Sequence, residues 1–263
     1  MNDQEKKKQH IFLVLTGLFL TNAILAEMIG VKIFSGEGTL GLQPANLKLF
    51  GGFVLDFNLT AGAVIWPIVF ISTDIINEYF GKKGVRKISF LAAGLIAYAF
   101  IVIYVITLLP PANFWLEVNK LDPEGNPFNI NFAFKKIFTQ GLGIIIGSLT
   151  AFLLGQLLDV LVFQKLRKIT GEKMVWLRAT GSTLVSQLID SFVVLAIAFY
   201  ILAPAGSRWS VDQVVSVGII NYIYKFAVAI LLTPLIYLGH FLIDKYLGEH
   251  AEQIKAEAAA SSF

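Results

Sequence analysis

The stretch "TAGAVIWPIVFISTDIINEYFG" (residues 60–81) joins an apolar run to a polar end within one segment. Its first half is as apolar as lipid, and Asp74, Asn77 and Glu78 then follow within five residues. On an α-helix, residues i, i+3 and i+4 share one face, so these three side chains point the same way. That face is either a hydrated helix end or the wall of a polar cavity.

The composition of the whole chain is that of an integral membrane protein. Of its 263 residues, 56% are hydrophobic and 15% are charged, whereas soluble domains carry about 25% charged residues. The mean hydropathy is +0.71. The absence of cysteine excludes a disulfide framework and a cysteine-based metal site. We also expect no cofactor and no metal. A net charge of +3 gives no indication of a nucleic-acid partner.

Six apolar segments are long enough to cross a bilayer, which requires about 20 residues each. We therefore predict an all-α membrane protein, a six-helix bundle over residues 10–245, with a cytoplasmic N-terminus (1–9) and a cytoplasmic tail (246–263). The first segment has the length of a retained signal-anchor helix rather than a cleaved signal peptide. The six predicted spans are His10–Lys32, Thr60–Phe80, Ile88–Leu109, Ile137–Phe163, Trp176–Ala203 and Val214–Ile243.

The lysine and arginine residues set the predicted orientation, because cytoplasmic loops of membrane proteins carry an excess of them. With the N-terminus inside, 14 of the 21 fall on the inner side, six on the outer side, and Lys225 lies within a span. Both termini are therefore predicted to be cytoplasmic. The inner residues are Lys6, Lys7, Lys8, Lys82, Lys83, Arg86, Lys87, Lys165, Arg167, Lys168, Lys173, Arg178, Lys245 and Lys255.

Two long outer connections and a stripe of small residues complete the predicted architecture. Residues 36–58 are expected to form a hairpin or a half-inserted cap, and residues 110–134 either cover an outward entrance or rest at the lipid headgroups. Gly143, Gly147, Ala151 and Gly155 recur every four residues, a spacing that lets another helix approach closely. We expect this stripe to pack inside the bundle or at the seam of a homodimer.

Several polar side chains fall inside the predicted spans, where a charged group costs about 2.5–3.5 kcal/mol on insertion scales. Each of these residues also has a purely structural explanation. Asp190 and Lys225 can form an ion pair that only holds two helices together, and Glu78 can lie at a solvated helix end. One shared polar cavity explains all of them together, so we predict a binding site. The residues assigned to substrate binding are Asn22, Glu27, Gln156, Gln187, Asp190 and Lys225. Those assigned to a gate or pathway are Asp74, Asn77, Glu78, Asp159 and Arg178.

The residue types in this predicted cavity suit a flat heterocycle. Carboxamides both donate and accept hydrogen bonds, and a carboxylate accepts two parallel N–H bonds, as a guanine-like ring presents them. Trp66 and Tyr224 offer aromatic surface. The chain has no phosphate-binding loop, no His-Glu-x-x-His motif and no Gly-x-Ser-x-Gly motif, so we predict that it is not an enzyme.

The sequence resembles the queuosine precursor transporters, a family formerly called vitamin uptake transporters. The resemblance is carried by "FISTDIINEYFGKKGVRK", "TNAILAEMIGVK", "GQLLDVLVFQKLRK", "WLRATGSTLVSQLIDSFVV" and "NYIYKFAVAILLTPLIY", which together touch most of the chain. It implies a bacterial inner-membrane importer of 7-cyano- and 7-aminomethyl-7-deazaguanine, salvaged for tRNA modification. It also implies the polar positions named above together with Lys32.

Within this resemblance, we expect Asp190 or Glu27 to accept the ring's protons and Gln187, Asn22 or Gln156 to pair with its carbonyl. Lys225 would balance the buried acids, and Asp74 with Glu78 and Arg178 would form an inner gate. The alternative is a substrate-capture subunit of an energy-coupling-factor vitamin importer. Such subunits also have six spans but require an ATPase complex, for which the small-residue stripe would be a docking face.

Overall fold

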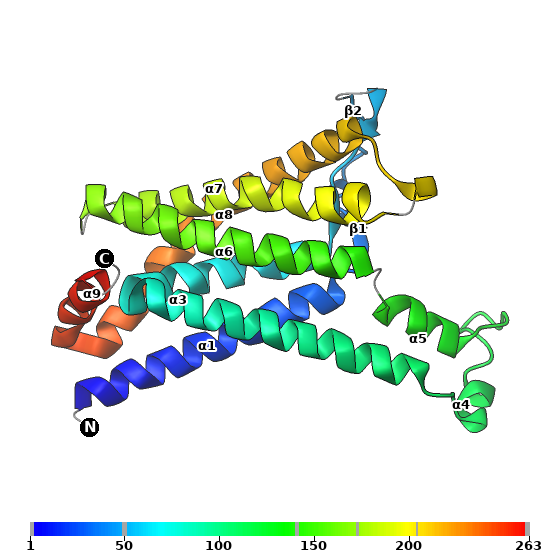
Figure 1. The fold of residues 1–263 in the computed structure, drawn as a ribbon, viewed down its shortest axis with the longest axis horizontal. Helices are drawn as coiled ribbons and strands as arrows, with labels where there is room; N and C mark the ends of the chain where they lie inside the picture. Colours follow the sequence, from blue (N-terminus) through cyan, green and yellow to red (C-terminus); the bar gives the residue numbers. More distant parts are fainter. Residues whose placement is uncertain (1–2, 49–51, 140–141, 172–173, 204, 261–263) are drawn as a thin grey trace.

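The computed structural model describes residues 3–48, 52–139, 142–171, 174–203 and 205–260. It is a bundle of long helices (Figure 1), and five helical segments within these ranges are long and apolar enough to cross a membrane. The predicted all-α membrane class is therefore confirmed. These segments contain α1 (Asp3–Ile29), α3 (Gly62–Leu108), α6 (Leu142–Thr170), α7 (Val175–Leu195) and α8 (Val211–Leu247).

Short elements connect and extend these helices. The C-terminal end of α7 continues as a π-helical stretch, Ala196–Ile201. The predicted fourth span begins inside α5 and passes residues 140–141, which lie outside the described ranges. The short elements are β1 (Ile33–Ser35), α2 (Gly36–Thr39), β2 (Leu47–Lys48), β3 (Val54–Leu55), β4 (Asn58–Thr60), α4 (Asn113–Val118), α5 (Ile130–Phe138), the 3-10 turns Ala205–Ser207 and Gly248–His250, and α9 (Ala251–Ala260).

The helix α3 reverses direction at Gly81. Its 47 residues would extend for about 70 Å as one straight helix, more than twice the hydrocarbon thickness of a bilayer. Gly81 interrupts it with φ 66° and ψ −173°, a conformation open to glycine because it has no Cβ. Figure 1 shows the two halves of α3 running back past each other. The predicted second and third spans both lie in α3, one on each side of this reversal.

The small-residue stripe of α6 packs inside the bundle. A Cβ atom on Gly147 would stand 3.0 Å from the carbonyl oxygen of Val194, and one on Gly143 would stand 3.3 Å from Cβ of Leu202. Both positions therefore face α7 and its π-helical continuation at backbone distance. The packing role predicted for this stripe is realised between two helices of the same chain.

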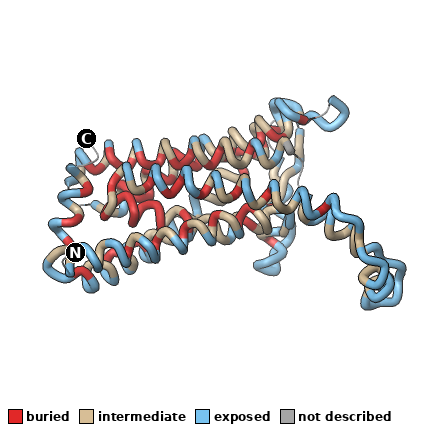
Figure 2. The backbone as a smooth tube through the Cα atoms, turned by 60° about the horizontal axis from the view of Figure 1, so that its bottom comes forward, coloured by how far each residue is buried: buried red, intermediate tan, exposed pale blue. Residues whose placement is uncertain are grey.

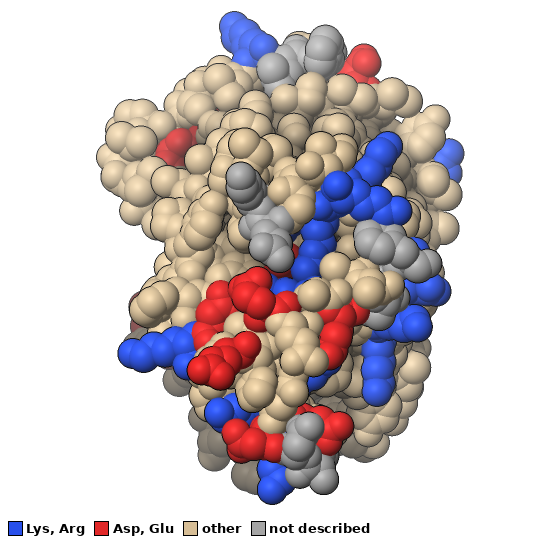
Figure 3. All heavy atoms as spheres, turned by 90° about the vertical axis from the view of Figure 1, so that its left-hand side faces the viewer, with Lys and Arg blue, Asp and Glu red and all other residues tan. Residues whose placement is uncertain are grey.

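The two termini lie at one end of the bundle, called the termini end below, and the strands, α4 and α5 lie at the other, called the loop end (Figure 1). Figure 3 looks onto the termini end and shows basic and acidic side chains gathered there. Helix α9 packs onto this end. Its Ile254 is fully buried, Lys255 bonds Asp244 of α8 at 2.9 Å, and Glu257 pairs with Lys8 at 3.1 Å.

The first loop-end connection is a small, ordered cap. Strands β1 and β4 pair antiparallel with Phe34 opposite Leu59, and β2 pairs with β3. The carboxylate of Glu37 accepts hydrogen bonds from the backbone N–H of Phe57 at 2.8 Å and of Ala45 at 3.3 Å. The Phe57 N–H is the main group that holds the pKa of Glu37 below its ordinary value. By contrast, the arm containing α4 and α5 extends away from the bundle and is largely exposed (Figure 2).

Candidate functional site

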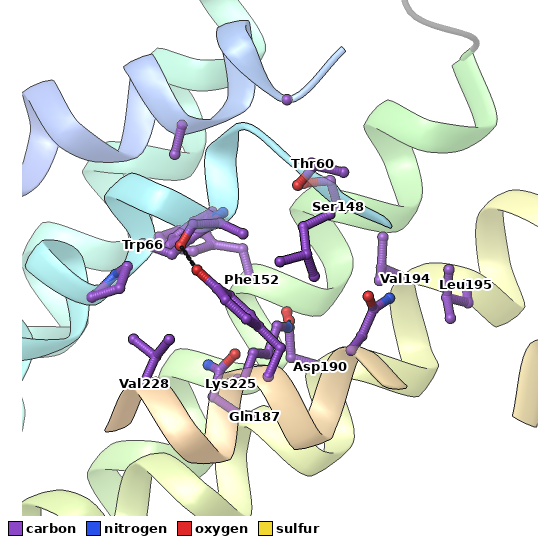
Figure 4. Close-up of a pocket in the computed structure, with 18 of the residues that line it drawn as sticks. Thr60, Trp66, Ser148, Phe152, Gln187, Asp190, Val194, Leu195, Lys225 and Val228 are labelled. Carbon is purple, nitrogen blue, oxygen red and sulfur yellow. Dashed lines mark hydrogen bonds and ion pairs between the residues drawn. The ribbon is translucent and has the colours of Figure 1, made fainter. Parts of the chain in front are cut away.

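A cavity of about 800 Å³ opens between the helices, within the range of small-molecule sites. Its walls come from α1, α3, α6, α7 with its π-helical continuation, and α8, and at the loop end from the segment β3 to β4 and from Lys136 of α5. Figure 4 shows Trp66 and Ser148 on one side of this space and Gln187 and Lys225 on the opposite side. Distant parts of the chain therefore meet around a single space inside an apolar bundle.

An ion pair between α7 and α8 forms part of the wall. Nζ of Lys225 bonds Oδ2 of Asp190, and the two side chains are 21% and 22% exposed. Both line the cavity. The sequence left open whether these residues form a structural ion pair or belong to a site. They do pair, and the pair faces the cavity with hydrogen-bonding capacity left on both partners.

Other polar groups line the same cavity. Glu27 of α1 accepts from the Ser148 hydroxyl of α6, whose oxygen lies 2.5 and 2.6 Å from the two carboxylate oxygens. Oε1 of Gln156 accepts from Thr73 at 3.2 Å. Gln187 is 3% exposed, and its Oε1 has no hydrogen-bond partner among the described residues. Carboxylate and carboxamide groups from α1, α6 and α7 thus face one space.

Aromatic rings form the apolar part of the wall. Trp66 stacks on Phe70 and lies 5.7 Å from Phe152, measured between ring centroids. Phe199 and Trp209 stack at 4.3 Å toward the loop end, and both line the cavity. A flat ligand can lie against such faces while its edge bonds the polar groups.

Two carboxylates lie where the cavity approaches the termini end. Asp74 lines the cavity and is 2% exposed, and no hydrogen bond to its Oδ1 is made within the described part of the chain. Asp159 of α6 lies behind the cavity wall, with the hydroxyl oxygens of Ser186 and Thr183 at 3.3 and 3.5 Å from its Oδ1.

A separate buried cluster seals the termini end. Oε1 of Glu78 lies 2.7 Å from Arg178 and 3.2 Å from Arg167, and all three side chains are at most 9% exposed. Asn77 accepts from Gln164 at 2.6 Å. Neither Asn77, Glu78 nor Arg178 lines the cavity. The residues assigned to a gate therefore divide: Asp74 faces the cavity, whereas Glu78 and Arg178 form a packed layer beyond it.

Asn22 is the one residue assigned to substrate binding that does not line the cavity. Its side chain donates to the carbonyl of Leu18, one turn earlier in α1, at 2.8 Å. The inward face of α1 carries Phe19, Ala23 and Glu27, spaced four apart, and Asn22 is rotated about 100° from Ala23. Lys32, implied by the family resemblance, is exposed.

Sequence reasoning missed Ser148, Phe152 and Arg167. A signal for the first two exists, because Ser148, Phe152 and Gln156 are spaced four apart and share one face of α6. Arg167 was counted only as a basic residue of an inner loop, yet it is the second cation on Glu78. Its role depends on α6 continuing to Thr170, seven residues past the predicted end of the span.

A protein-family model described as "Putative vitamin uptake transporter" matches residues 60–239, which contain α3, α6, α7 and most of α8. The chain belongs to this family. It is thus a multi-pass membrane protein of a transporter family and not an enzyme, with a small molecule as its substrate. No solved structure matches the chain.

Three curated relatives agree in name. The chain is 31% identical over 232 residues to the "Probable queuosine precursor transporter" of Bacillus subtilis (strain 168), covering 84% of this chain and 93% of the relative. It is 30% identical over 231 residues to the protein of the same name from Haemophilus influenzae, covering 88% and 86%. The "Queuosine precursor transporter" of Escherichia coli (strain K12) is 28% identical over 177 residues, covering 67% and 70%.

Proposed function

We propose that this transporter imports the 7-cyano and 7-aminomethyl forms of 7-deazaguanine, for salvage into tRNA queuosine, across a bacterial inner membrane. The names of the relatives support the substrate class. The reversal of α3 at Gly81 supports six spans, with five long helical segments crossing six times. The common end for both termini (Figure 1), together with the basic bias of that side, supports a cytoplasmic placement of the termini.

The observation that carries the proposal is the pairing of aromatic faces with a polar edge in one cavity. A deazaguanine ring is flat, and its edge presents an amide N–H and an amino group beside a carbonyl. Glu27 and Asp190 supply acceptors from α1 and α7, and Gln187 and Asn221 supply donors and acceptors. Trp66 and Phe152 supply surface for the ring.

The positions suggest a division of roles. Oδ2 of Asp190 is held by Lys225, which leaves Oδ1 for the ring's protons, and a carboxylate held by a cation is fixed in orientation. The amide N–H₂ of Gln187 can donate to the ring carbonyl, and its Oε1, which is unbonded in the described chain, can accept from the ring. Asn22 lies outside the cavity. The predicted hydrogen bond to the ring carbonyl is therefore assigned to Gln187, Gln156 or Asn221.

The position of the small-residue stripe weighs against the capture-subunit alternative. Gly143 and Gly147 face α7 and its continuation at 3.0–3.4 Å, so these glycines are not free to receive an ATPase subunit. An importer that works without such a subunit is consistent with this packing.

The test is the melting temperature of the purified protein with each deazaguanine precursor, guanine, riboflavin or biotin, because a ligand that binds only the folded state raises it. We expect a rise with a deazaguanine precursor that Asp190→Asn abolishes and Asp212→Asn, at the exposed start of α8, retains. A rise with riboflavin or biotin alone would move the assignment to a vitamin importer.

A further inference from the structure

One carboxylate of the cavity has no hydrogen-bond or ion-pair partner among the described residues. Asp74 is 2% exposed, and its Oδ1 accepts no hydrogen bond from any described residue. No lysine or arginine nitrogen of the described chain lies within 4.0 Å of Asp74 or of Asp159. An isolated buried carboxylate is strongly destabilising unless a proton or a cation neutralises it. Asp74 therefore requires a positive charge that the described side chains do not provide.

Asp159 receives only long hydroxyl contacts. Oγ1 of Thr183 donates to its Oδ1 at 3.5 Å, and Oγ of Ser186 lies 3.3 Å from the same oxygen and 3.0 Å from the carbonyl oxygen of Thr183. A hydroxyl has one proton, so Ser186 can donate to only one of these two acceptors. Neutral hydroxyls do not balance the charge of a carboxylate that is 4% exposed, so Asp159 also calls for a proton or a cation.

Other charged groups of α1, α3, α6, α7 and α8 near the cavity are already engaged with each other or with hydroxyls, and Lys136 of α5 lines the cavity from the loop end. On α3, Glu78 is matched by Arg178 of α7 and Arg167 of α6. On α8, Lys225 is held by Asp190 of α7. On α1, Glu27 bonds Ser148. The surroundings of Asp74 and Asp159 thus contain acids and hydroxyls but no spare cation from the described chain.

We propose that Asp74 and Asp159, together with the hydroxyl oxygens of Thr183 and Ser186, bind one monovalent cation, a proton or a sodium ion, that is coupled to transport. This inference rests on the proposed function for the identity of the transported substrate. Oxygen ligands of this kind suit a hard cation. Ionisable groups inside membrane helices are typical of ion and proton pathways in transporters.

The position of this site explains how cation and substrate would be linked. Asp74 and Thr183 line the substrate cavity, and Thr183 also contacts Asp159. A cation on the two carboxylates cancels one of their two negative charges before the uncharged 7-cyano precursor enters. Binding of either ligand then favours the other, with a typical coupling of about 1–3 kcal/mol, or roughly 5- to 150-fold in affinity.

The experiment uses the full-length protein in liposomes, with uptake of a deazaguanine precursor under an inward sodium gradient, an inward proton gradient, or neither. We expect one gradient to raise the initial rate by about fivefold or more, and its identity distinguishes sodium from proton. Asp74→Asn, Asp159→Asn and the isosteric Thr183→Val should lose this stimulation. Asp212→Asn should keep it. Equal rates under all three conditions would overturn the proposal.

A second readout needs no substrate and separates this inference from the proposed function. The melting temperature of the substrate-free protein is measured against sodium concentration and against pH, for the wild type and for Asp74→Asn and Asp159→Asn. A response to sodium or pH that both variants lose supports the site even if neither precursor is transported. Identical responses of the wild type and both variants would refute it.

Discussion

Two ion pairs tie α7 to its neighbours, and they differ in exposure rather than in chemistry. Glu78 and Arg178 join α3 to α7 with side chains 3% and 2% exposed. Asp190 and Lys225 join α7 to α8 with side chains 22% and 21% exposed. The first pair is surrounded by protein at the termini end, and the second faces the cavity. A polar residue in a membrane helix is therefore not by itself a site residue.

The hydrogen bonds of the two pairs agree with this difference. Arg178 also donates to the carbonyl of Gly171 at 2.6 Å, and Arg167 donates to the carbonyls of Glu78 and of Lys255 in α9. These bonds fasten α3, α6, α7 and α9 together. The exposed sides of Asp190 and Lys225 instead leave room for a ligand.

The largest expected effect follows from breaking the buried pair. Glu78→Gln leaves Arg178 and Arg167 without their carboxylate, and removing one partner of a buried ion pair typically costs about 3–5 kcal/mol. We expect a large fall in the melting temperature of the purified protein. The matched variant is Glu117→Gln, whose carboxylate is 71% exposed in its pair with Lys120. Equal melting temperatures for both variants would show that the buried cluster is not structural.

The helix seam beside the cavity gives the next effect. Gly147→Val places a branched side chain against the carbonyl of Val194, 3.0 Å from the new Cβ. Overpacking of this kind typically costs about 1–3 kcal/mol, so the melting temperature should fall. Gly94→Val is the control, because a Cβ on Gly94 meets nothing within 4 Å. If the control were as damaging as Gly147→Val, close packing between α6 and α7 would not be the reason for the loss.

Most of the residues that line the cavity could be predicted from the sequence. Lipid provides no hydrogen-bond partner, so a polar residue inside an apolar span is expected to face a cavity or another polar group. Glu27, Asp74, Gln156, Gln187 and Asp190 were all selected as polar residues inside apolar spans, and all five line the cavity. The membrane class followed from composition in the same way.

The other features of the site depend on how the helices pack together, and no local sequence pattern predicts that packing. Helix α1 is apolar around most of its circumference, so nothing marks its inward face, and Asn22 could not be separated from Glu27. The two acidic residues Glu78 and Asp74, four apart, read alike in sequence. Glu78 differs from Asp74 because Arg167 of α6 and Arg178 of α7 pair with its carboxylate.

The cavity pair supplies the opposite half of the comparison. Asp190→Asn keeps the shape of the side chain and leaves Lys225 about one-fifth exposed, where water can solvate it. We expect a stability loss of at most about 1 kcal/mol, as for accessible ion pairs. A loss as large as that of Glu78→Gln, measured in the same melting experiment, would show that both pairs are structural.

The smallest effect is expected at the loop end. Glu37 organises the cap through N–H bonds from Phe57 and Ala45, yet the cap lies outside the buried bundle. Because its pKa is lowered from 4.5, its contribution to stability is present above that value and is lost as the pH falls through the lowered pKa. At neutral pH, Glu37→Gln removes the charge and leaves a weaker acceptor for both N–H groups.

We therefore expect Glu37→Gln to speed hydrogen exchange of the Phe57 amide at neutral pH without a measurable change in the melting temperature. Acidification of the wild type below the lowered pKa of Glu37 should reduce the protection of the Phe57 amide, relative to an unprotected amide at the same pH, and the variant should show no further response. Unchanged exchange would mean that strand pairing alone holds the cap. A large drop in the melting temperature would place the cap within the cooperative core, and the contrast between a rigid termini end and an adjustable cavity mouth would fail.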